Sequence, residues 1–241
     1  MMRAFRYAEA LIADFPKLHS LVCFVDGLSS EPSVSGVVEE NVAIARERLR
    51  RYGSESQIEA VRDWRAAYRQ SGVDPTKFRM AAESILRRLR SSDEFATGLH
   101  PLVLLCNALS ARFAIPVAGL DVDHIDGLLE VGYASGHSEY QGFDGVVTVV
   151  PAGEVTFEDE AGRAHARKWS HRQSGASAIS SSTTRAFVVA EALHADCEAD
   201  LLTLSAALHD AIRQHWPQAS CTARLLSGRT LTVDFPCPRF N

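Results

Sequence analysis

The chain has 241 residues, of which 46% are hydrophobic and 23% are charged, and its formal net charge is −5 at pH 7. This length accommodates one large domain or two small ones, with a sizeable buried core. No stretch approaches the roughly 20 apolar residues that a membrane span needs. The N-terminus shows no uninterrupted apolar signal core, and the C-terminal FPCPRFN matches no lipidation box. The composition excludes a helical membrane protein and favours a soluble globular one.

The charge is distributed unevenly along the chain. Residues 1–90 carry 15 Lys and Arg against 12 Asp and Glu, net +3, whereas residues 91–241 carry 10 against 18, net −8. Arg outnumbers Lys 22 to 3, and Arg is the better residue for bidentate phosphate contacts, but a high-GC genome gives the same excess. The total charge argues against nucleic-acid binding, so only local basic patches can indicate it.

The cysteines indicate a reducing environment. They form an odd, scattered set without a CxxC motif, which in a chain of this size favours free thiols in a cytoplasm. They are Cys23, Cys106, Cys197, Cys221 and Cys237. His209 and His215 lie six positions apart and do not share a helical face. We therefore expect a cytoplasmic protein with no metal and no cofactor.

Helical patterns dominate the first 115 residues. Val38, Val42 and Leu49 recur at helical spacing, and Ser56-Gln57-Ile58-Glu59 has the form of a capping box. Asp74-Pro75 is typical of a helix start. The predicted elements are a short helix and an apolar strand within 1–30, and helices at 37–51, 56–71, 74–90 and 101–115. The last of these is apolar on nearly all sides, which predicts burial.

The pattern changes after Pro116. Short Val-rich runs, separated by Gly, Pro and acidic turns, predict strands at 127–134, 145–150, 153–162 and 185–193. A helix is predicted at 198–216, and two strands, at 220–226 and 230–235, flank the Ser227-Gly228 turn. Helices gather first and strands later, so the fold class is α+β.

Two motifs resemble known sites but lack residues that those sites require. GHSEY (136–140) begins like a nucleophile elbow, but Tyr140 occupies a position that needs a small residue. The acidic turn around Asp121 does not match a calcium loop, because Asp126 and Gly132 stand where Gly and Glu are required. A serine hydrolase of the elbow type and an EF-hand are both disfavoured.

Four segments are rich in Arg. Those at 46–51, 62–69 and 87–90 lie on predicted amphipathic helices, where a solvated face is the simplest explanation. The fourth, RAHARKWSHR (163–172), lies in the acidic half of the chain and runs directly into a Ser/Thr-rich tract. This combination is suited to holding a polyanion beside a polar site, although a polar surface loop also explains the Ser/Thr tract.

Several ordered motifs resemble a known family. A Pro-led apolar helix carries an Asn and is followed by a Pro and by a turn that ends in Asp; these positions are Pro101, Asn107, Pro116, Gly119, Leu120 and Asp121. An Arg-x-Trp-x-x-Arg-Gln motif follows at Arg167, Trp169, Arg172 and Gln173. Over about residues 60–225 the chain resembles the editing domain of the phenylalanyl-tRNA synthetase beta subunit, the B-three/four domain, which also occurs as stand-alone proteins.

The resemblance implies a fold and a domain division. It implies N-terminal helices packed on mixed or antiparallel β-sheets. Residues 1–60 lie outside it and are expected to form a helical extension, with 60–241 as one compact unit. The family's pocket His corresponds to Ala118 here, and its strand-end Glu corresponds to Ala190, with Glu191 one residue on. A one-residue shift turns a strand side chain to the other face, so Glu191 is not expected to replace that Glu.

The resemblance implies hydrolysis of a mischarged aminoacyl-tRNA. Such an ester needs a positioned water and donors for the developing oxyanion, and the expected catalytic candidates are Asn107, His137, His171, Ser182 and Thr183. The expected substrate-binding residues are Pro116, Asp121, Arg167, Lys168, Trp169, Arg172, Gln173 and Thr184. Among these the basic residues would hold phosphates at the acceptor end, and Trp169 or His171 would stack on a base.

Two functions remain open from the sequence. The first is a trans-editing deacylase that removes a wrong amino acid from tRNA. The second is a tRNA-binding or small-ligand-binding module that kept the fold without the chemistry, which Ala118 and Ala190 favour. A polar cavity between Asn107 and the Ser180–Thr184 tract is expected for the first.

Overall fold

The structure is a computed structural model that describes residues 3–228 and 230–235. The described helices are α1 (Glu9–Asp14), α2 (Ser35–Tyr52), α3 (Glu59–Gln70), α4 (Ala81–Ser92), α5 (Pro101–Phe113) and α6 (Cys197–His215), with 3-10 turns at Glu55–Gln57 and Val122–His124. The described strands are β1 (Arg3–Tyr7), β2 (His19–Asp26), β3 (Val117–Asp121), β4 (Leu128–Tyr133), β5 (Glu139–Gln141), β6 (Val147–Val149), β7 (Val155–Asp159), β8 (Arg163–Arg167), β9 (Arg172–Gln173), β10 (Arg185–Ala192), β11 (Ser220–Ser227) and β12 (Thr232–Phe235).

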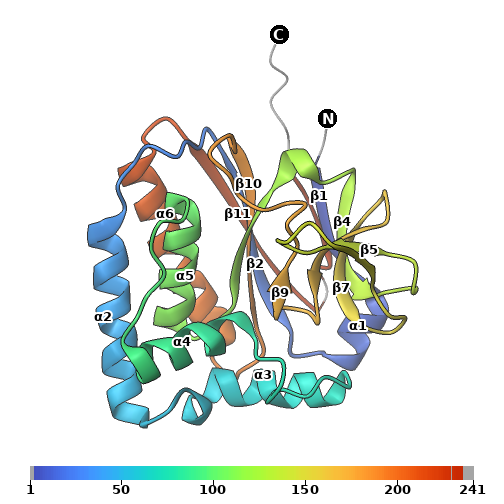
Figure 1. Cartoon of the computed structure of the whole chain (residues 1–241), viewed down its shortest axis with the longest axis horizontal. Coiled ribbons are helices and arrows are strands. Elements are labelled where there is room, and N and C mark those ends of the chain that lie inside the picture. The colour runs from blue at the N-terminus through green and yellow to red at the C-terminus, as the bar shows by residue number, and fades with distance from the viewer. Residues whose placement is uncertain (1–2, 229, 236–241) are drawn as a thin grey trace.

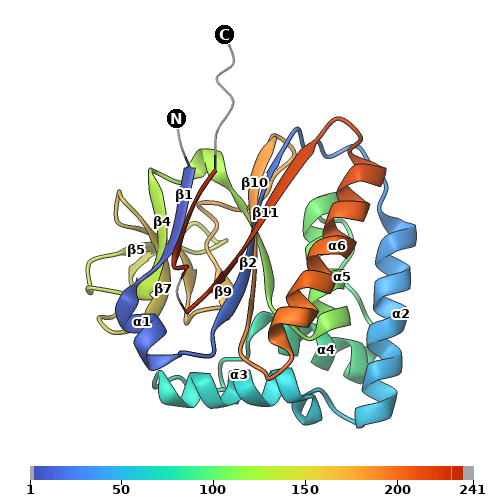
Figure 2. The same ribbon diagram turned by 180° about the vertical axis from the view of Figure 1, so that it is seen from behind.

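Two β-sheets lie side by side, and the larger helices cover the far side of one of them (Figures 1 and 2). The smaller sheet has the order β11-β2-β10-β3 and is antiparallel throughout. The larger sheet runs β12-β1-β4-β7-β8-β5-β6, with β9 paired to β8, and it is mixed because the β1–β4 and β5–β8 pairs are parallel. The α+β fold with helices packed on mixed and antiparallel sheets is confirmed.

Phenylalanine side chains fill the space between the sheets. Phe187 of β10 lies 6.5 Å, between ring centroids, from Phe5 of β1 and 6.0 Å from Phe24 of β2. Phe157 of β7 and Phe235 of β12 complete the cluster. All five rings are buried, and burying each contributes roughly 2–3 kcal/mol. This cluster fixes how the two sheets face each other, and β10 is apolar on both faces because it lies between two layers.

The helices bury the apolar faces that their sequences predict. Trp64 and Tyr68, spaced i and i+4 on α3, are each 1% exposed, which confirms that they face the core. α5 is buried along nearly its whole length, as its continuous apolar sequence predicts. It begins with Pro101 in the first turn, where a missing N–H is harmless. It packs on β3, with α2 and α4 against its other sides.

The N-terminal segment is not a separate helical extension. β1 lies between β12 and β4 in the larger sheet, and β2 lies between β10 and β11 in the smaller one. The short helix and the apolar strand expected within residues 1–30 are present as α1 and β2, but a strand precedes them. The prediction of a helical extension is therefore wrong, because β2 pairs with strands that lie more than 150 residues later in the chain.

Two predicted helix starts are also shifted. α3 begins at Glu59, after a 3-10 turn, and the expected capping box forms no side-chain cap. Asp74 accepts from the N–H of Thr76 in a local turn, whereas α4 begins only at Ala81. The backbone between Asp74 and Ala81 hydrogen-bonds to a segment distant in the sequence. The Ala81 N–H donates to the Ser170 carbonyl, and the His171 ring contacts the Arg79 carbonyl.

Candidate functional site

A cavity of about 120 Å³ opens beside β3, the edge strand of the smaller sheet. The larger sheet contributes side chains from β7, β8 and β9, and α4 and α5 close the other side. Residues from six separate parts of the sequence line it: Ala81, Asn107, Pro116, Val117, Ala118, Leu120, Phe157, Ala166, Trp169, Ser170, His171, Arg172, Gln173, Val189 and Glu191. Six of the thirteen residues expected from the sequence therefore share this cavity, namely Asn107, Pro116, Trp169, His171, Arg172 and Gln173.

Asn107 presents a free amide to the cavity. It is half-buried in the middle of α5, and no described residue hydrogen-bonds to its side chain. α5 ends at Ala114, which has a left-handed backbone, and Pro116 then starts the turn into β3. The N–H of Val117 donates to Ser110 Oγ over 2.8 Å, which ties the strand back to the helix. Both the donor and the acceptor of the Asn107 amide are thus available to a ligand.

Glu191 supplies the only carboxyl among the lining residues. Tyr7 Oη donates to its Oε1 over 2.7 Å and Trp169 Nε1 donates to the same oxygen over 3.0 Å. No described residue hydrogen-bonds to Oε2. The side chain is fully buried, and burial raises its pKa to about 7 although the two hydrogen bonds lower it. Tyr7 stays neutral, because burial, followed by the Glu191 charge, raises its pKa well above 10.0.

The register of β10 decides which residue reaches the cavity. Val189 pairs with Ala118 and Ala190 pairs with Val117. Val189 and Glu191 line the cavity, whereas Ala190 does not, because neighbouring strand residues point to opposite faces. The expectation that Glu191 could not supply the carboxyl of the pocket is therefore wrong: Glu191 lines the cavity, Ala190 does not, and Ala118 lines it as well.

The loop between β8 and β9 forms the mouth of the cavity. His171 Nδ1 lies 2.6 Å from the Arg79 carbonyl oxygen, and since a carbonyl only accepts, Nδ1 carries the proton and Nε2 holds a lone pair in the neutral ring. Arg172 is exposed and makes no hydrogen bond or ion pair with a described residue. Gln173 Nε2 donates to the Gly119 carbonyl over 2.7 Å, which anchors the loop to β3.

Two expected phosphate ligands and one expected stacking residue have other contacts. Arg167 and Lys168 are both paired with Glu154, at 2.8 and 2.7 Å. The Trp169 ring is 1% exposed and lies between Phe15 and Trp64, with both centroid distances 4.9 Å. A buried ring cannot stack on an incoming base, so the stacking role expected for Trp169 is wrong. The hydrogen bond from its indole to Glu191 explains its position instead.

The Ser/Thr tract lies at the other end of β3. Thr183 Oγ1 donates to Asp121 Oδ2 over 2.6 Å, and the Ser180 N–H donates to Thr183 Oγ1 over 2.9 Å. Ser182 is exposed, and the Thr184 carbonyl accepts from the backbone N–H groups of Gly27 and Leu28. Pro116 and Asp121 lie at opposite ends of β3, and no residue from Ser180 to Thr184 lines the cavity that contains Asn107, contrary to the expectation. Asp121 and Thr183 stabilise a turn.

His137 also lies apart from the cavity. It is exposed in the loop that leads from β4 to β5 and is absent from the lining residues. Conversely, the sequence pattern gave no reason to single out Tyr7. Its partner Glu191 is 184 positions away, and a contact of that separation has no local signature.

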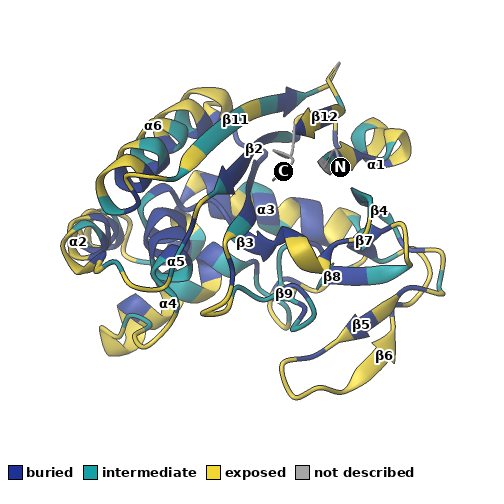
Figure 3. Ribbon diagram, turned by 90° about the horizontal axis from the view of Figure 1, so that it is seen from above, coloured by how far each residue is buried: buried dark blue, intermediate teal, exposed yellow. Residues whose placement is uncertain are grey.

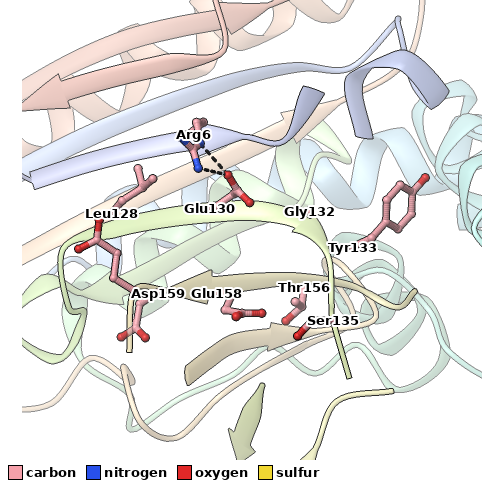
Figure 4. Close-up of a pocket in the computed structure, with 10 residues that line it drawn as sticks. Arg6, Leu128, Glu130, Gly132, Tyr133, Ser135, Thr156, Glu158 and Asp159 are labelled. Carbon is pink, nitrogen blue, oxygen red and sulfur yellow. Dashed lines mark hydrogen bonds and ion pairs between the residues drawn. The ribbon is translucent and has the colours of Figure 1, made fainter. Parts of the chain in front are cut away.

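A second hollow, of about 320 Å³, lies over the larger sheet (Figure 4). Most of its charged side chains already have partners within the protein: Glu130 is paired with Arg6, Glu158 accepts from Ser138, and Asp159 accepts from Arg163, while Glu160 adds a further carboxyl. Burial raises the pKa of Asp159, but hydrogen bonds from His165, backbone N–H groups and Arg163 outweigh burial and bring this pKa far below its usual range. An acidic hollow repels phosphate, so it is a poor site for a nucleic acid.

Across residues 3–228 and 230–235, no three His, Cys, Asp or Glu side chains gather in a way that would hold a metal ion. None of the described helices is long and apolar enough to cross a bilayer.

The fold is that of an α+β domain, and the cavity beside β3 is small and partly polar. A family model described as the B3/4 domain matches residues 63–200, more than half of the sequence, and the chain belongs to that family. Among solved structures, it is similar to an N-terminal fragment of the phenylalanyl-tRNA synthetase beta subunit from Pyrococcus horikoshii, with 7% identity and a TM-score of 0.49. The match covers 98% of this chain and 55% of that one, so the chain spans about half the length of the fragment. No curated protein matches the sequence.

Proposed function

We propose that this protein is an aminoacyl-tRNA deacylase that acts in trans on a mischarged tRNA. The observation that carries the proposal is the cavity itself, which brings the free amide of Asn107, the His171 ring and the Glu191 carboxyl to one place. Its volume of about 120 Å³ is below the roughly 300–1,000 Å³ of drug-sized ligand sites. This size suits a single amino acid. The sequence resemblance to an editing domain supports an aminoacyl ester as the substrate.

The proposed reaction needs only water and polar side chains. Water attacks the carbonyl carbon of the ester, the bond to the ribose oxygen breaks, and the products are a free amino acid and a tRNA with its hydroxyl restored. His171 Nε2 takes a proton from the water, because its Nδ1–H is already bound to the Arg79 carbonyl, and gives it to the ribose oxygen as that oxygen leaves. Asn107 donates to the oxygen that gains negative charge. Glu191 Oε2 accepts from a donor group of the bound amino acid.

The tRNA is proposed to approach over the β8–β9 loop. Arg172 is the cation of this loop that is exposed and has no ion pair to a described residue, so it is free to contact a phosphate. Arg167 and Lys168 are not free in this sense, because both are paired with Glu154. Replacing Arg172 by Gln should weaken tRNA binding and lower the slope of log affinity against log salt by about 1.

A second candidate is a binding module without turnover. Ala118 leaves space where the resembling family carries a His, and the hydroxyl groups of Ser182, Thr183 and Thr184 lie away from the cavity. In that case the cavity binds an amino acid or the end of a tRNA, and no ester is cleaved.

A deacylation assay against a panel of mischarged tRNAs tests the first candidate. The wild-type protein should release the amino acid from at least one member of the panel, and Asn107→Ala should lower that rate by about 10²-fold, the typical loss for one oxyanion donor. His137→Ala is the matched control, because His137 is exposed outside the cavity, and it should leave the rate unchanged. Salt-sensitive tRNA binding without turnover on any member would favour the binding module. If no tRNA binds at low salt, both candidates fail.

A further inference from the structure

Two consecutive residues that are not glycine adopt left-handed backbone conformations beside the cavity. Lys168 has φ of +47° and Trp169 has φ of +59°. Each such residue costs on the order of 1–2 kcal/mol relative to an extended or right-handed conformation. They occur in succession directly after β8, where the chain turns toward β9. Conformations of this kind persist only where surrounding contacts hold them.

The Glu154 side chain makes those contacts. Its Oε1 accepts from Arg167 Nε over 2.8 Å and from the Lys168 backbone N–H over 3.0 Å. Its Oε2 accepts from Arg167 Nη2 over 2.9 Å and from Lys168 Nζ over 2.7 Å. The carboxyl is 7% exposed. Burial raises its pKa, but the hydrogen bonds from Arg167 and Lys168 outweigh burial and bring the pKa to about 2, so it is ionised at neutral pH.

Aromatic rings contact the same two cations. The Arg167 guanidinium lies 5.6 Å from the Tyr140 ring centroid, and Lys168 Nζ lies 4.7 Å from the Phe78 ring centroid. Each contact of this kind contributes roughly 0.5–1 kcal/mol or more when desolvated. Each of the two cations therefore contacts both Glu154 and an aromatic ring, as expected for groups that shape a loop.

The Lys168–Trp169 turn directs the Trp169 indole toward Glu191. The Trp169 N–H donates to the Val155 carbonyl over 2.8 Å, which places the residue next to β7. Its indole then extends between Phe15 and Trp64, and its Nε1 reaches Glu191 Oε1. Without the left-handed pair the chain would continue in the direction of β8, and the indole would not point at the carboxyl.

We propose that Glu154 is a positioning residue of the cavity: it holds the left-handed Lys168–Trp169 turn and thereby sets the hydrogen bond between Trp169 and Glu191. Its effect on catalysis rests on the proposed function, but its effect on Glu191 does not. Of the other titratable groups around Glu191, Tyr7 and Tyr68 stay neutral because burial raises their pKa, and His171 and Arg172 line the same cavity. Trp169 is thus the second hydrogen-bond donor to Glu191, after Tyr7, and the turn positions it.

The test is a titration of the Glu191 carboxyl carbon by 13C NMR in the full-length chain. Glu154→Ala should raise the pKa of Glu191 by about one pH unit, because a hydrogen bond that stabilises the ionised form is lost. Removing a negative charge alone would act in the opposite direction and lower that pKa, so the sign separates the two effects. Trp169→Phe should give a rise of similar size. Glu158→Ala is the matched control, since Glu158 lies on β7, the strand that directly follows Glu154, but contacts Ser138.

A rescue variant tests whether the effect passes through the turn. Glycine adopts a positive φ without the steric cost that a side chain imposes, so adding Lys168→Gly to Glu154→Ala should return the pKa of Glu191 toward the wild-type value. If Glu154→Ala does not fold, Glu154→Gln takes its place, with a smaller rise expected because one amide oxygen can still accept. A Glu191 titration that matches that of Glu158→Ala, or a rise that Lys168→Gly does not reverse, overturns the proposal. A changed titration in a protein without deacylation activity leaves this inference standing and removes only the proposed function.

Discussion

Glu191 combines burial, two donors on one oxygen and an open second oxygen. Burial penalises the charged form, and the hydrogen bonds from Tyr7 and Trp169 offset that penalty only in part, so the pKa rises to about 7. At neutral pH the protonated and the ionised forms of Glu191 are therefore both populated. The free Asn107 amide and the His171 ring lie in the same cavity. At the residue scale, the site is a set of polar groups whose hydrogen-bonding capacity is only partly used within the protein.

Stability should depend on pH through Glu191. Its pKa is higher in the folded chain than the ordinary 4.5, so the folded state binds the proton more tightly. Its contribution is therefore present at pH 4.5 and is lost as pH rises to about 7, by up to about 3 kcal/mol. Urea unfolding of the wild type and of Glu191→Gln from pH 4.5 to 8 should show the difference between their free energies of unfolding falling across this interval. A pH-independent difference would contradict the pKa, and Glu160→Gln, at an exposed site, is the control.

β10 shows how one strand serves two layers. Phe187 and Glu191 face the larger sheet, where they contact Phe5 and Tyr7 of β1. Ala186, Val188 and Ala190 alternate with them and face the helices. A strand covered on both sides needs side chains of the right size on each, and this accounts for its nearly continuous burial. At the element scale, the register of β10 determines which carboxyl the cavity receives.

Moving the carboxyl by one residue should destabilise the protein and leave the cavity without an acid. In an Ala190→Glu, Glu191→Ala variant, the new carboxyl points toward the helices at a position that is 0% exposed. An unpaired buried charge there should cost about 3 kcal/mol or more, measured by urea unfolding. Ala190→Ser with Glu191→Ala is the control, because it keeps the small size at position 190. If the Ala190→Glu, Glu191→Ala variant is as stable as this control, position 190 does not face the helices.

The two sheets are assembled from distant parts of the chain. β1 pairs with β12, and β2 pairs with β10 and β11, so the first strands and the last ones depend on each other. The cavity takes residues from α4, α5, β3, the β8–β9 loop and β10, and the donor Tyr7 comes from β1 (Figure 3 shows the layers from above). At the scale of the molecule, the site exists only in the complete fold.

The segment 63–200, which matches the family model, should therefore not fold alone. It lacks β1, β2, β11 and β12, so the smaller sheet loses two of its four strands and exposes Phe187. We expect no cooperative urea transition and poorly dispersed amide NMR signals from this fragment, in contrast to the full chain. Dispersed signals with a cooperative transition would instead support an independent unit beginning near residue 60.

The sequence by itself determined the class of the fold and many of the residues at the site. The apolar stripe of α3, the buried α5 and the Val-rich strands follow from local periodicity, and the motifs around Asn107 and Trp169 led to the family. Local patterns could not show that residues 1–26 contribute a strand to each sheet, because hydrogen bonds between distant strands leave no local trace.

The tertiary structure alone decided what the site contains. It separated the Ser/Thr tract from Asn107, because the two lie at opposite ends of β3, and it turned Glu191 rather than Ala190 into the cavity through the register of β10. It also tied Arg167 and Lys168 to Glu154 and buried Trp169. Each of these outcomes depends on which groups meet after the two sheets pack together, and packing is a property of the whole chain.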